Sequence, residues 1–190
     1  MRINTLFLII ITVLFVGCKT NTVSNTRISD EIDFSFTNKT EIIKTEKNRK
    51  SKDISLGYFW GVDENIYPMF EKYSFQDPKS YERPKNEFLL KVDYFFTKSE
   101  ELKCKLYEWN INYDSKNQSK SLQKKFGEIK EFVTTKIGKP SFENYEDLST
   151  STEQTVRDDV KWTSENLGAY LFRFKGKGGF DQIRLSIYEK

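Results

Sequence analysis

The sequence predicts an α+β domain, in which an antiparallel sheet of about five strands is covered on one face by one amphipathic helix. The first observation is the order of the patterns along the chain, which is β-β-α-β-β-β. Strands that occur in runs, with a helix segregated from them, are typical of α+β domains. The second observation is that the strand patterns alternate between apolar and polar residues, as strands with one buried face do.

The first two predicted strands form a hairpin. Residues 88–96 place large apolar side chains on one face, and residues 103–113 do the same. The apolar residues are Phe88, Leu90, Val92, Tyr94 and Phe96, followed by Tyr107, Trp109, Ile111 and Tyr113. The polar connection at residues 98–101 is short, which favours antiparallel pairing of the two strands.

The strongest helical pattern lies between residues 115 and 138. Its apolar residues recur at spacings of three and four, so that they form one stripe. The stripe consists of Leu122, Phe126, Ile129, Val133 and Ile137. Ser115 and Gln118 match a capping box at the start, while Gly138 and Pro140 are typical of a helix end. We expect the remaining surface to face solvent. Its lysines are Lys120, Lys124, Lys125 and Lys130.

The C-terminal part predicts a polar loop followed by three strands. The loop covers residues 141–158, and the strands cover residues 160–163, 169–175 and 180–188. The glycine-rich stretch at residues 175–179 includes the hairpin turn, residues 176–179, which joins the last two strands. Glycines and lysines can bind an anion, but this turn lacks the spacing of a phosphate-binding loop and leads into a strand. We therefore interpret it as a hairpin tip.

The N-terminus carries the most specific signal in the chain. Arg2 precedes an apolar run at residues 6–16, which is about 16 Å long as a helix, whereas a bilayer core is about 30 Å thick. A positive start and a short apolar run are typical of a secretory signal peptide. The residues that follow, Phe15-Val16-Gly17-Cys18, resemble the lipobox of bacterial lipoproteins, although Phe15 replaces the usual leucine. An ordinary signal peptide, or an apolar helix with a chance cysteine, is the alternative.

The lipobox resemblance covers residues 1–18 only. It implies that residues 1–17 are a lipoprotein signal peptide and that Cys18 becomes a lipidated first residue, carrying palmitate-type acyl chains. Several chains would attach the protein stably to a membrane. The resemblance further implies a place in the bacterial cell envelope, with the domain outside the cytoplasm. Lys19 stands where an aspartate would signal inner-membrane retention, which favours the outer membrane.

Composition divides the rest of the chain at residue 54. Residues 18–53 are polar and mixed in charge, and we interpret them as a lipidated cysteine and a tether. Within them, the alternating residues 32–36 are a possible docked strand, and the basic residues 47–52 are possible contacts to anionic headgroups. Residues 54–190 are predicted to form a single domain, entered by an apolar strand or extended segment at residues 54–62. Prolines at residues 68, 78 and 84 argue against a long helix after it.

Composition also excludes several kinds of chemistry. The chain has no histidine, which rules out Ser-His-Asp and Cys-His catalysis and most zinc sites. Its 31 basic and 28 acidic residues are interspersed and leave a net charge of +3, which argues against a nucleic-acid binder. If Cys18 carries lipid, Cys104 is the remaining thiol, and we expect it to be buried and inert. No metal or cofactor is predicted.

Two further groups of residues are candidates for a site. Six carboxylates surround the loop after the helix, and paired carboxylates can hydrolyse glycosides or bind calcium, although no known spacing is matched. They are Glu143, Glu146, Asp147, Glu153, Asp158 and Asp159. Aromatic residues make up 15% of the chain and include Trp60, Trp109 and Trp162. We expect most of them to fill the core, with exposed ones able to stack on sugars or bind a protein.

The sequence therefore predicts a lipid-anchored envelope protein that is not an enzyme and that contacts another envelope component. The alternative is a glycan- or peptide-binding module that uses exposed aromatic side chains. A hydrolase that uses the loop carboxylates ranks last. The ligand, the partner and the residues that would bind them are left open.

Overall fold

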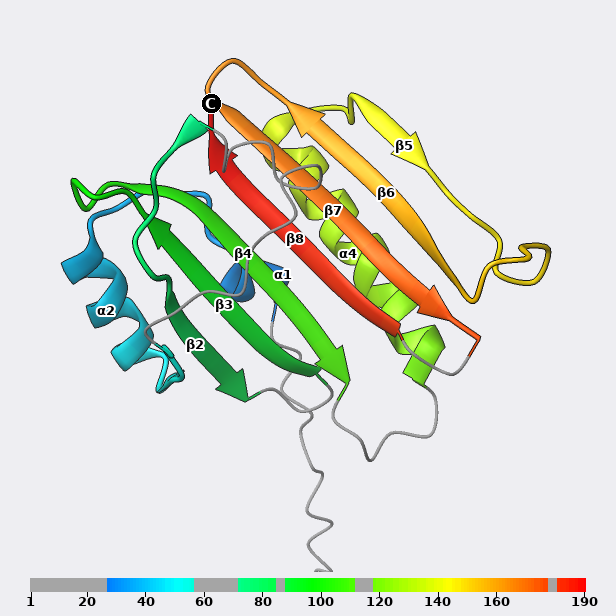
Figure 1. Cartoon of the computed structure of the whole chain (residues 1–190), viewed down its shortest axis with the longest axis horizontal. Helices are drawn as coiled ribbons and strands as arrows, with labels where there is room; N and C mark the ends of the chain where they lie inside the picture. Colours follow the sequence, from blue (N-terminus) through cyan, green and yellow to red (C-terminus); the bar gives the residue numbers. More distant parts are fainter. Residues whose placement is uncertain (1–26, 57–71, 85–87, 112–117, 178–180) are drawn as a thin grey trace, which may run out of the picture.

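The computed structural model describes residues 27–56, 72–84, 88–111, 118–177 and 181–190 (Figure 1). Within these residues the chain forms one antiparallel sheet of eight strands, in the order β1-β2-β3-β4-β8-β7-β6-β5. The strands are β1 (Lys52–Asp53), β2 (Lys79–Pro84), β3 (Phe88–Phe96), β4 (Leu102–Ile111), β5 (Phe142–Asn144), β6 (Thr155–Thr163), β7 (Leu167–Gly176) and β8 (Asp181–Glu189). The helices are α1 (Ile28–Glu31), α2 (Lys39–Asn48) and α4 (Gln118–Ile137).

The prediction of an α+β domain with five strands was wrong, because the fold is β-rich and its sheet has eight strands. The five predicted strands are present as β3, β4, β6, β7 and β8, while β1, β2 and β5 are additional. β2 has no apolar alternation because Arg83, rather than an apolar residue, occupies one of its buried positions. β5 forms within the predicted loop, and all three of its residues are exposed. The strand predicted at residues 54–62 lies mostly outside the described residues, and 54–56 are not in a strand.

Both predicted hairpins are confirmed. β3 pairs with β4, with Val92 opposite Tyr107, and β7 pairs with β8, with Leu171 opposite Leu185. The first turn is closed by a hydrogen bond from the Thr97 N–H to the Glu101 carbonyl. β4 and β8 then pair with each other and join the two halves at the centre of the sheet.

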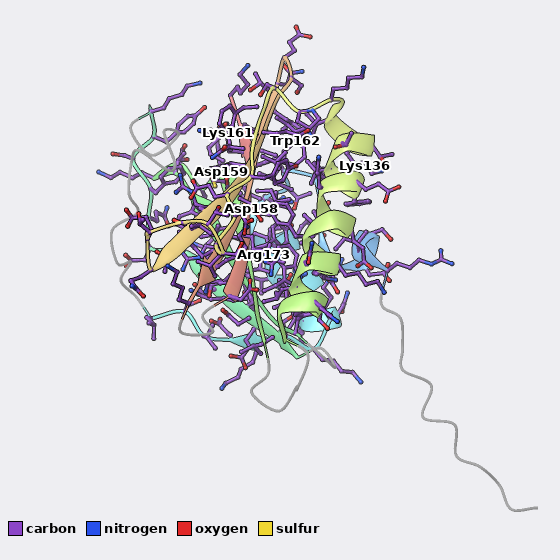
Figure 2. The ribbon with its side chains drawn as sticks, turned by 90° about the vertical axis from the view of Figure 1, so that its right-hand side faces the viewer. Lys136, Asp158, Asp159, Lys161, Trp162 and Arg173 are labelled. Atoms are coloured by element: carbon purple, nitrogen blue, oxygen red, sulfur yellow. The ribbon has the colours of Figure 1, made fainter. Side chains whose placement is uncertain are left out.

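All three helices lie on the same face of the sheet (Figures 1 and 2). The predicted apolar stripe of α4 is confirmed, because Leu122, Ile129 and Val133 are fully buried in the core on this face. The predicted end of the helix is confirmed as well. Gly138 follows the last helical residue with a φ of +109°, a conformation that favours glycine at this position. The predicted cap residue Ser115 lies outside the described residues.

A second and smaller group of buried side chains lies on the opposite face of the sheet. It comprises Phe95, Cys104, Leu106, Tyr170 and Phe172. Because side chains alternate across a strand, these residues point away from the three helices. Cys104 is fully buried here, as predicted, and burial raises the pKa of its thiol. A thiol in this state is a poor nucleophile.

The prediction of a polar tether was wrong for residues 28–53. α1 and α2 form within this stretch, and Ile32 and Ile42 are buried in the core. α2 begins at an N-cap, where the Asn38 side chain accepts a hydrogen bond from the Glu41 N–H. The stretch was mistaken for a tether because much of its attachment to the sheet is polar, and polar attachment gives no apolar pattern.

A buried ion pair fixes α2 to the sheet. Glu46 is fully buried, and Arg83 of β2 donates to both of its carboxylate oxygens. The Tyr94 hydroxyl and the Ser51 hydroxyl also donate to Glu46. Burial by itself would raise the pKa of Glu46, but the hydrogen bonds and charge of Arg83 outweigh it and lower that pKa to about 2. The polar groups of this cluster therefore satisfy one another's hydrogen bonds in the buried interior.

A second buried ion pair holds α1 against α4. The ammonium of Lys125 lies 2.8 Å from a carboxylate oxygen of Glu31, which also accepts a hydrogen bond from the Trp109 indole. Lys125 also lies over the ring of Phe88. The expectation that Lys125 faces solvent was therefore wrong, since α1 covers this part of the helix.

Lys105 fixes the chain between α1 and α2. It is fully buried in β4, and its ammonium donates to the backbone carbonyls of Asp33 and Ser35. Burial lowers the pKa of Lys105 to about 8, against the raising effect of the nearby Asp33 carboxylate. Residues 32–36, a possible strand by sequence, are irregular backbone, and Lys105 satisfies the carbonyls of Asp33 and Ser35 within it.

We expect Arg83→Met to lower the free energy of unfolding by about 3–5 kcal/mol, because it leaves the buried Glu46 carboxylate without its buried cation. The double variant Glu46→Met/Arg83→Met should recover most of this loss. Arg49→Met is the matched control, since Arg49 contacts the same carboxylate from a partly exposed position and should cost under about 1 kcal/mol. Urea denaturation measures all three. A loss in Arg83→Met no larger than that in Arg49→Met would contradict the account.

We expect acid to destabilise the fold through Glu46. Its pKa is about 2 in the folded state and about 4.5 ordinarily, so the unfolded chain binds the proton first. Stability from this group is complete above pH 4.5 and is lost as the pH falls from 4.5 towards 2. In Glu46→Gln, the slope of unfolding free energy against pH should fall by up to about 1.4 kcal/mol per pH unit in this window. Glu41→Gln, on the exposed face of the same helix, should keep the slope. An unchanged slope in Glu46→Gln would refute the assignment.

Candidate functional site

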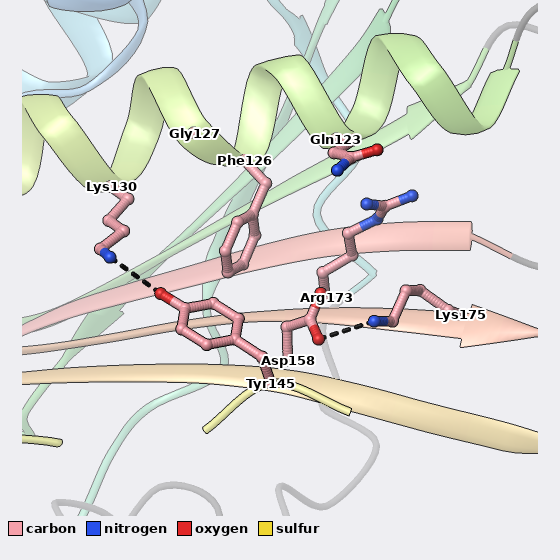
Figure 3. Close-up of a pocket in the computed structure, with 8 residues that line it drawn as sticks. All are labelled: Gln123, Phe126, Gly127, Lys130, Tyr145, Asp158, Arg173 and Lys175. Carbon is pink, nitrogen blue, oxygen red and sulfur yellow. Dashed lines mark hydrogen bonds and ion pairs between the residues drawn. The ribbon is translucent and has the colours of Figure 1, made fainter. Parts of the chain in front are cut away.

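A cavity of about 410 Å³ lies between α4 and the part of the sheet formed by β6 and β7 (Figure 3). We call it the helix–sheet cavity. Its lining residues are Gln123, Phe126, Gly127, Lys130, Tyr145, Asp158, Arg173 and Lys175. The volume lies within the range of small-molecule binding sites. The lining has four charged side chains and two aromatic rings, so it is more polar than that of most such sites.

α4 forms one wall of this cavity. Gln123, Gly127 and Lys130 are spaced by four and three residues and therefore lie on one side of the helix. A Cβ atom placed on Gly127 would have no other atom within 4 Å, so the cavity reaches the helix backbone at this residue. Phe126 is buried beside it and gives the wall its apolar part (Figure 3). The glycine keeps this space open.

At one end of the cavity, Lys130 holds a hydrogen-bonded group of three side chains. Its ammonium donates to Glu143 Oε2 at 2.6 Å and to the Tyr145 hydroxyl at 2.8 Å. The Tyr145 hydroxyl donates to the same carboxylate oxygen. The hydrogen bond to Glu143 raises the pKa of Lys130, and the hydrogen bond from Lys130 lowers the pKa of Glu143. Both groups therefore stay charged at neutral pH.

At the other end, Asp158 points into the cavity from β6. Its Oδ1 accepts hydrogen bonds from the Lys175 ammonium at 2.7 Å and from the Glu146 N–H at 3.1 Å. Both hydrogen bonds that Asp158 accepts from described residues go to Oδ1, which leaves Oδ2 without one. Nearby, the Arg173 guanidinium donates to Asp181 through Nε at 2.8 Å. The two cations at this end are thus each paired with a carboxylate.

The cavity retains hydrogen-bonding capacity for a ligand. An ammonium group has three donors, and both Lys130 and Lys175 use two of them within the described structure. Each lysine therefore has one N–H left. Asp158 Oδ2 is a remaining acceptor, and the exposed amide of Gln123 offers both kinds of group. Such a set suits a polar molecule that carries both donors and acceptors.

The six predicted carboxylates are not brought together into one site. Side chains alternate across β6, so Asp158 faces the helix–sheet cavity while Asp159 faces away from it. Asp159 instead accepts hydrogen bonds from the Tyr170 hydroxyl and from Arg157. Among the described residues, no group of three acidic or cysteine side chains is placed to hold a metal ion.

The other loop carboxylates have local structural contacts. Glu143 joins the Lys130 group, and Asp147 accepts hydrogen bonds from the N–H and hydroxyl of Ser149. Glu146 lies beside the cavity, where its backbone carbonyl accepts from Lys175. Glu153 is exposed. In the described lining, Asp158 is the only carboxylate, which does not match the facing pair of a glycosidase.

The structure also places the predicted aromatic residues. Trp109 and Trp162 are fully buried in the core, and Trp60 lies outside the described residues. Two other rings are exposed near the edge of the sheet, Phe142 by 48% and Tyr145 by 52%. Tyr145 forms a rim of the helix–sheet cavity, and Lys130 lies 5.4 Å from the centre of its ring.

Two predicted features fall partly or wholly outside the described residues. Cys18 and the signal segment are among them, and so are the last two glycines of the turn at residues 175–179. Lys177 before those glycines donates to the Ser151 carbonyl, and Lys175 belongs to the cavity. In the part of the chain that is described, no helix is long and apolar enough to cross a membrane.

Sequence reasoning missed the helix–sheet cavity because its residues come from α4, β6, β7 and the segment between β5 and β6. One local signal was present. Gly127 interrupts an otherwise regular helix at a cost of about 1 kcal/mol relative to alanine, and a glycine in this position often has a packing or functional reason. The second signal was Lys130 on the same side of the helix, which by itself resembled an ordinary solvated residue.

Comparison of the chain with protein-family models, with curated proteins and with solved structures found no match.

Proposed function

We propose that this chain is a lipid-anchored binding protein of the bacterial cell envelope, which is not an enzyme and which contacts another envelope component through the helix–sheet cavity. The observation that carries this proposal is the cavity itself. It has the volume of a ligand site, a helix wall opened by Gly127, and charged groups at both ends with hydrogen-bonding capacity left over.

The anchor proposed at Cys18 would hold this cavity close to a membrane. α1 begins at Ile28, ten positions after Cys18. A chain of that length spans at most about 35 Å when fully extended. The tether is therefore much shorter than the 18–53 segment expected from composition. A short tether restricts the protein to components within reach of the bilayer, and Lys19 favours the outer membrane as that bilayer.

The pairing of charges supports binding rather than catalysis. Lys130 and Glu143 neutralise each other, as do Lys175 and Asp158. A general acid or base works best with a pKa near the operating pH. Here the hydrogen bond between Lys130 and Glu143 moves both pKa values away from neutrality. Such groups bind and orient a ligand without exchanging protons.

A glycan- or peptide-binding module that uses exposed aromatic side chains is the second candidate function. The exposure of Phe142 and Tyr145 favours it, because each ring lies at the β5 edge with a lysine over it. The burial of Trp109 and Trp162 restricts any stacking surface in the described structure to such smaller rings. The two candidates share Tyr145, which is both exposed and part of the cavity.

We expect Cys18→Ala to release the protein from the membrane fraction, because the lipidated sulfur is lost while the folded domain is untouched. Cys104→Ala is the matched control. It removes the other thiol, which is buried in the opposite face of the sheet, and should leave the protein membrane-bound. Palmitate labelling followed by fractionation and salt washing measures the outcome. Retention of Cys18→Ala, or loss of label from Cys104→Ala alone, would contradict the anchor.

We expect a photoreactive residue at position 123 to form an adduct with an envelope component in intact cells. Gln123 is exposed at the cavity, whereas a control at Lys44 lies on the exposed face of α2. Gly127→Leu should abolish the adduct at 123, since its side chain would occupy the open space, and should not impair folding of an exposed helical position. Equal adducts at both positions, or no effect of Gly127→Leu, would contradict a binding role for the cavity.

A further inference from the structure

The helix–sheet cavity has two polar ends that differ in chemistry, separated by aromatic rings. Figure 3 shows Lys130 and Tyr145 at one end, Asp158, Arg173 and Lys175 at the other. The ring of Phe126 lies between them in this view. A ligand that fits this order has a polar group at each end and an apolar middle.

The Lys130 end favours an anionic group. The lysine keeps one N–H donor after its bonds to Glu143 and Tyr145, and that donor belongs to a charged ammonium. The pKa of Lys130 is raised by the hydrogen bond to Glu143, so the charge persists. A carboxylate would gain a charge-assisted hydrogen bond at this end, which is roughly twice as strong as a neutral one.

The Asp158 end offers an acceptor that can bind a cationic group. Asp158 Oδ2 accepts no hydrogen bond from a described residue, although the carboxylate is largely buried. The cations beside it are already paired, Lys175 with Asp158 and Arg173 with Asp181. An ammonium would donate to the remaining oxygen of Asp158. Lys175 keeps one donor at this end as well, so the feature that distinguishes the Asp158 end from the Lys130 end is the free carboxylate oxygen.

The distance between the two ends limits the size of the ligand. Gln123 and Lys130 are seven residues apart on α4, which corresponds to about 10 Å of helix. An extended peptide covers about 3.3–3.6 Å per residue, so two or three residues span a similar length. A free peptide of this size carries an ammonium at one end and a carboxylate at the other, and it has an apolar side chain for the middle.

We propose that the helix–sheet cavity binds short peptides of two or three residues with both termini free. The peptide carboxylate accepts from Lys130, and the peptide ammonium donates to Asp158 Oδ2. An apolar side chain of the peptide packs against Phe126 and the ring of Tyr145, where Gly127 leaves room for it. This inference deepens the binding role proposed above and rests on it. It identifies the ligand as a zwitterion rather than a simple anion.

The test compares a free tripeptide with blocked forms of the same peptide. The probes are Ala-Leu-Ala, its N-acetylated form, its C-terminal amide and tri-N-acetylglucosamine. Isothermal titration calorimetry measures their binding to the full lipidated chain in detergent micelles. We expect the free peptide to bind, and each block to weaken binding at least tenfold. No binding of the free peptide, equal binding of the blocked forms, or preferential binding of the sugar would overturn the proposal.

Variants then assign each peptide terminus to its residue. In Asp158→Asn, acetylation should no longer weaken binding further, and in Lys130→Met, amidation should no longer do so, because each interaction is already lost. Lys161→Met is the matched control. Lys161 is exposed and faces the other side of β6, so acetylation and amidation should each still weaken binding to this variant. If acetylation still weakened binding to Asp158→Asn, and amidation still weakened binding to Lys130→Met, the peptide would bind elsewhere.

Failure of the peptide-binding test can be told apart from failure of the crosslinking test, which examines the binding role itself. If the photoreactive residue at position 123 forms its Gly127-dependent adduct but no peptide binds, the ligand class alone is wrong. If neither is seen, the binding role of the cavity is wrong as well. The comparison of blocked with free peptides uses the unaltered protein, so it does not depend on whether Asp158→Asn folds.

Discussion

The packing of α4 against β6, β7 and β8 is the interaction on which the rest of the structure depends. Leu122, Ile129 and Val133 are fully buried in the core, and each contributes about 1.5–3 kcal/mol through burial. This packing fixes the rotation of the helix and therefore the direction of its other side chains. Gly127 and Lys130 then face β6 and β7, and together with these strands they form the helix–sheet cavity.

The N-terminal segment is attached to the same face of the sheet by buried charges. Glu46 binds Arg83, and Lys105 binds the carbonyls of the segment between α1 and α2. Such contacts are directional, and each partner is costly to leave alone. They bring the folded part of the chain to within ten positions of the proposed lipid anchor. The docked segment thus stabilises the fold, and it leaves a shorter stretch of chain for the proposed tether.

Elements with an apolar repeat were predictable from the sequence, and elements held by polar contacts were not. β3, β4, β7, β8 and α4 show clear periodicity and were found, because their burial pattern is local. α2 and β2 were missed, because they are held together by the ion pair between Glu46 and Arg83. These two residues are far apart in the chain, so their pairing leaves no local pattern in the sequence. The carboxylate loop was misleading for a different reason, because its last residues belong to a strand. Asp158 and Asp159 are neighbours in sequence, yet they lie on opposite faces of one strand.

The most direct test of this account is an NMR titration of the labelled protein with the free tripeptide Ala-Leu-Ala. The account predicts that the backbone amide signals of Gly127 and Tyr145 shift with saturable dependence on peptide concentration. The amide of Cys104, in the buried group on the opposite face, should stay unchanged. Shifts confined to residues outside the helix–sheet cavity, with Gly127 unaffected, would contradict the account.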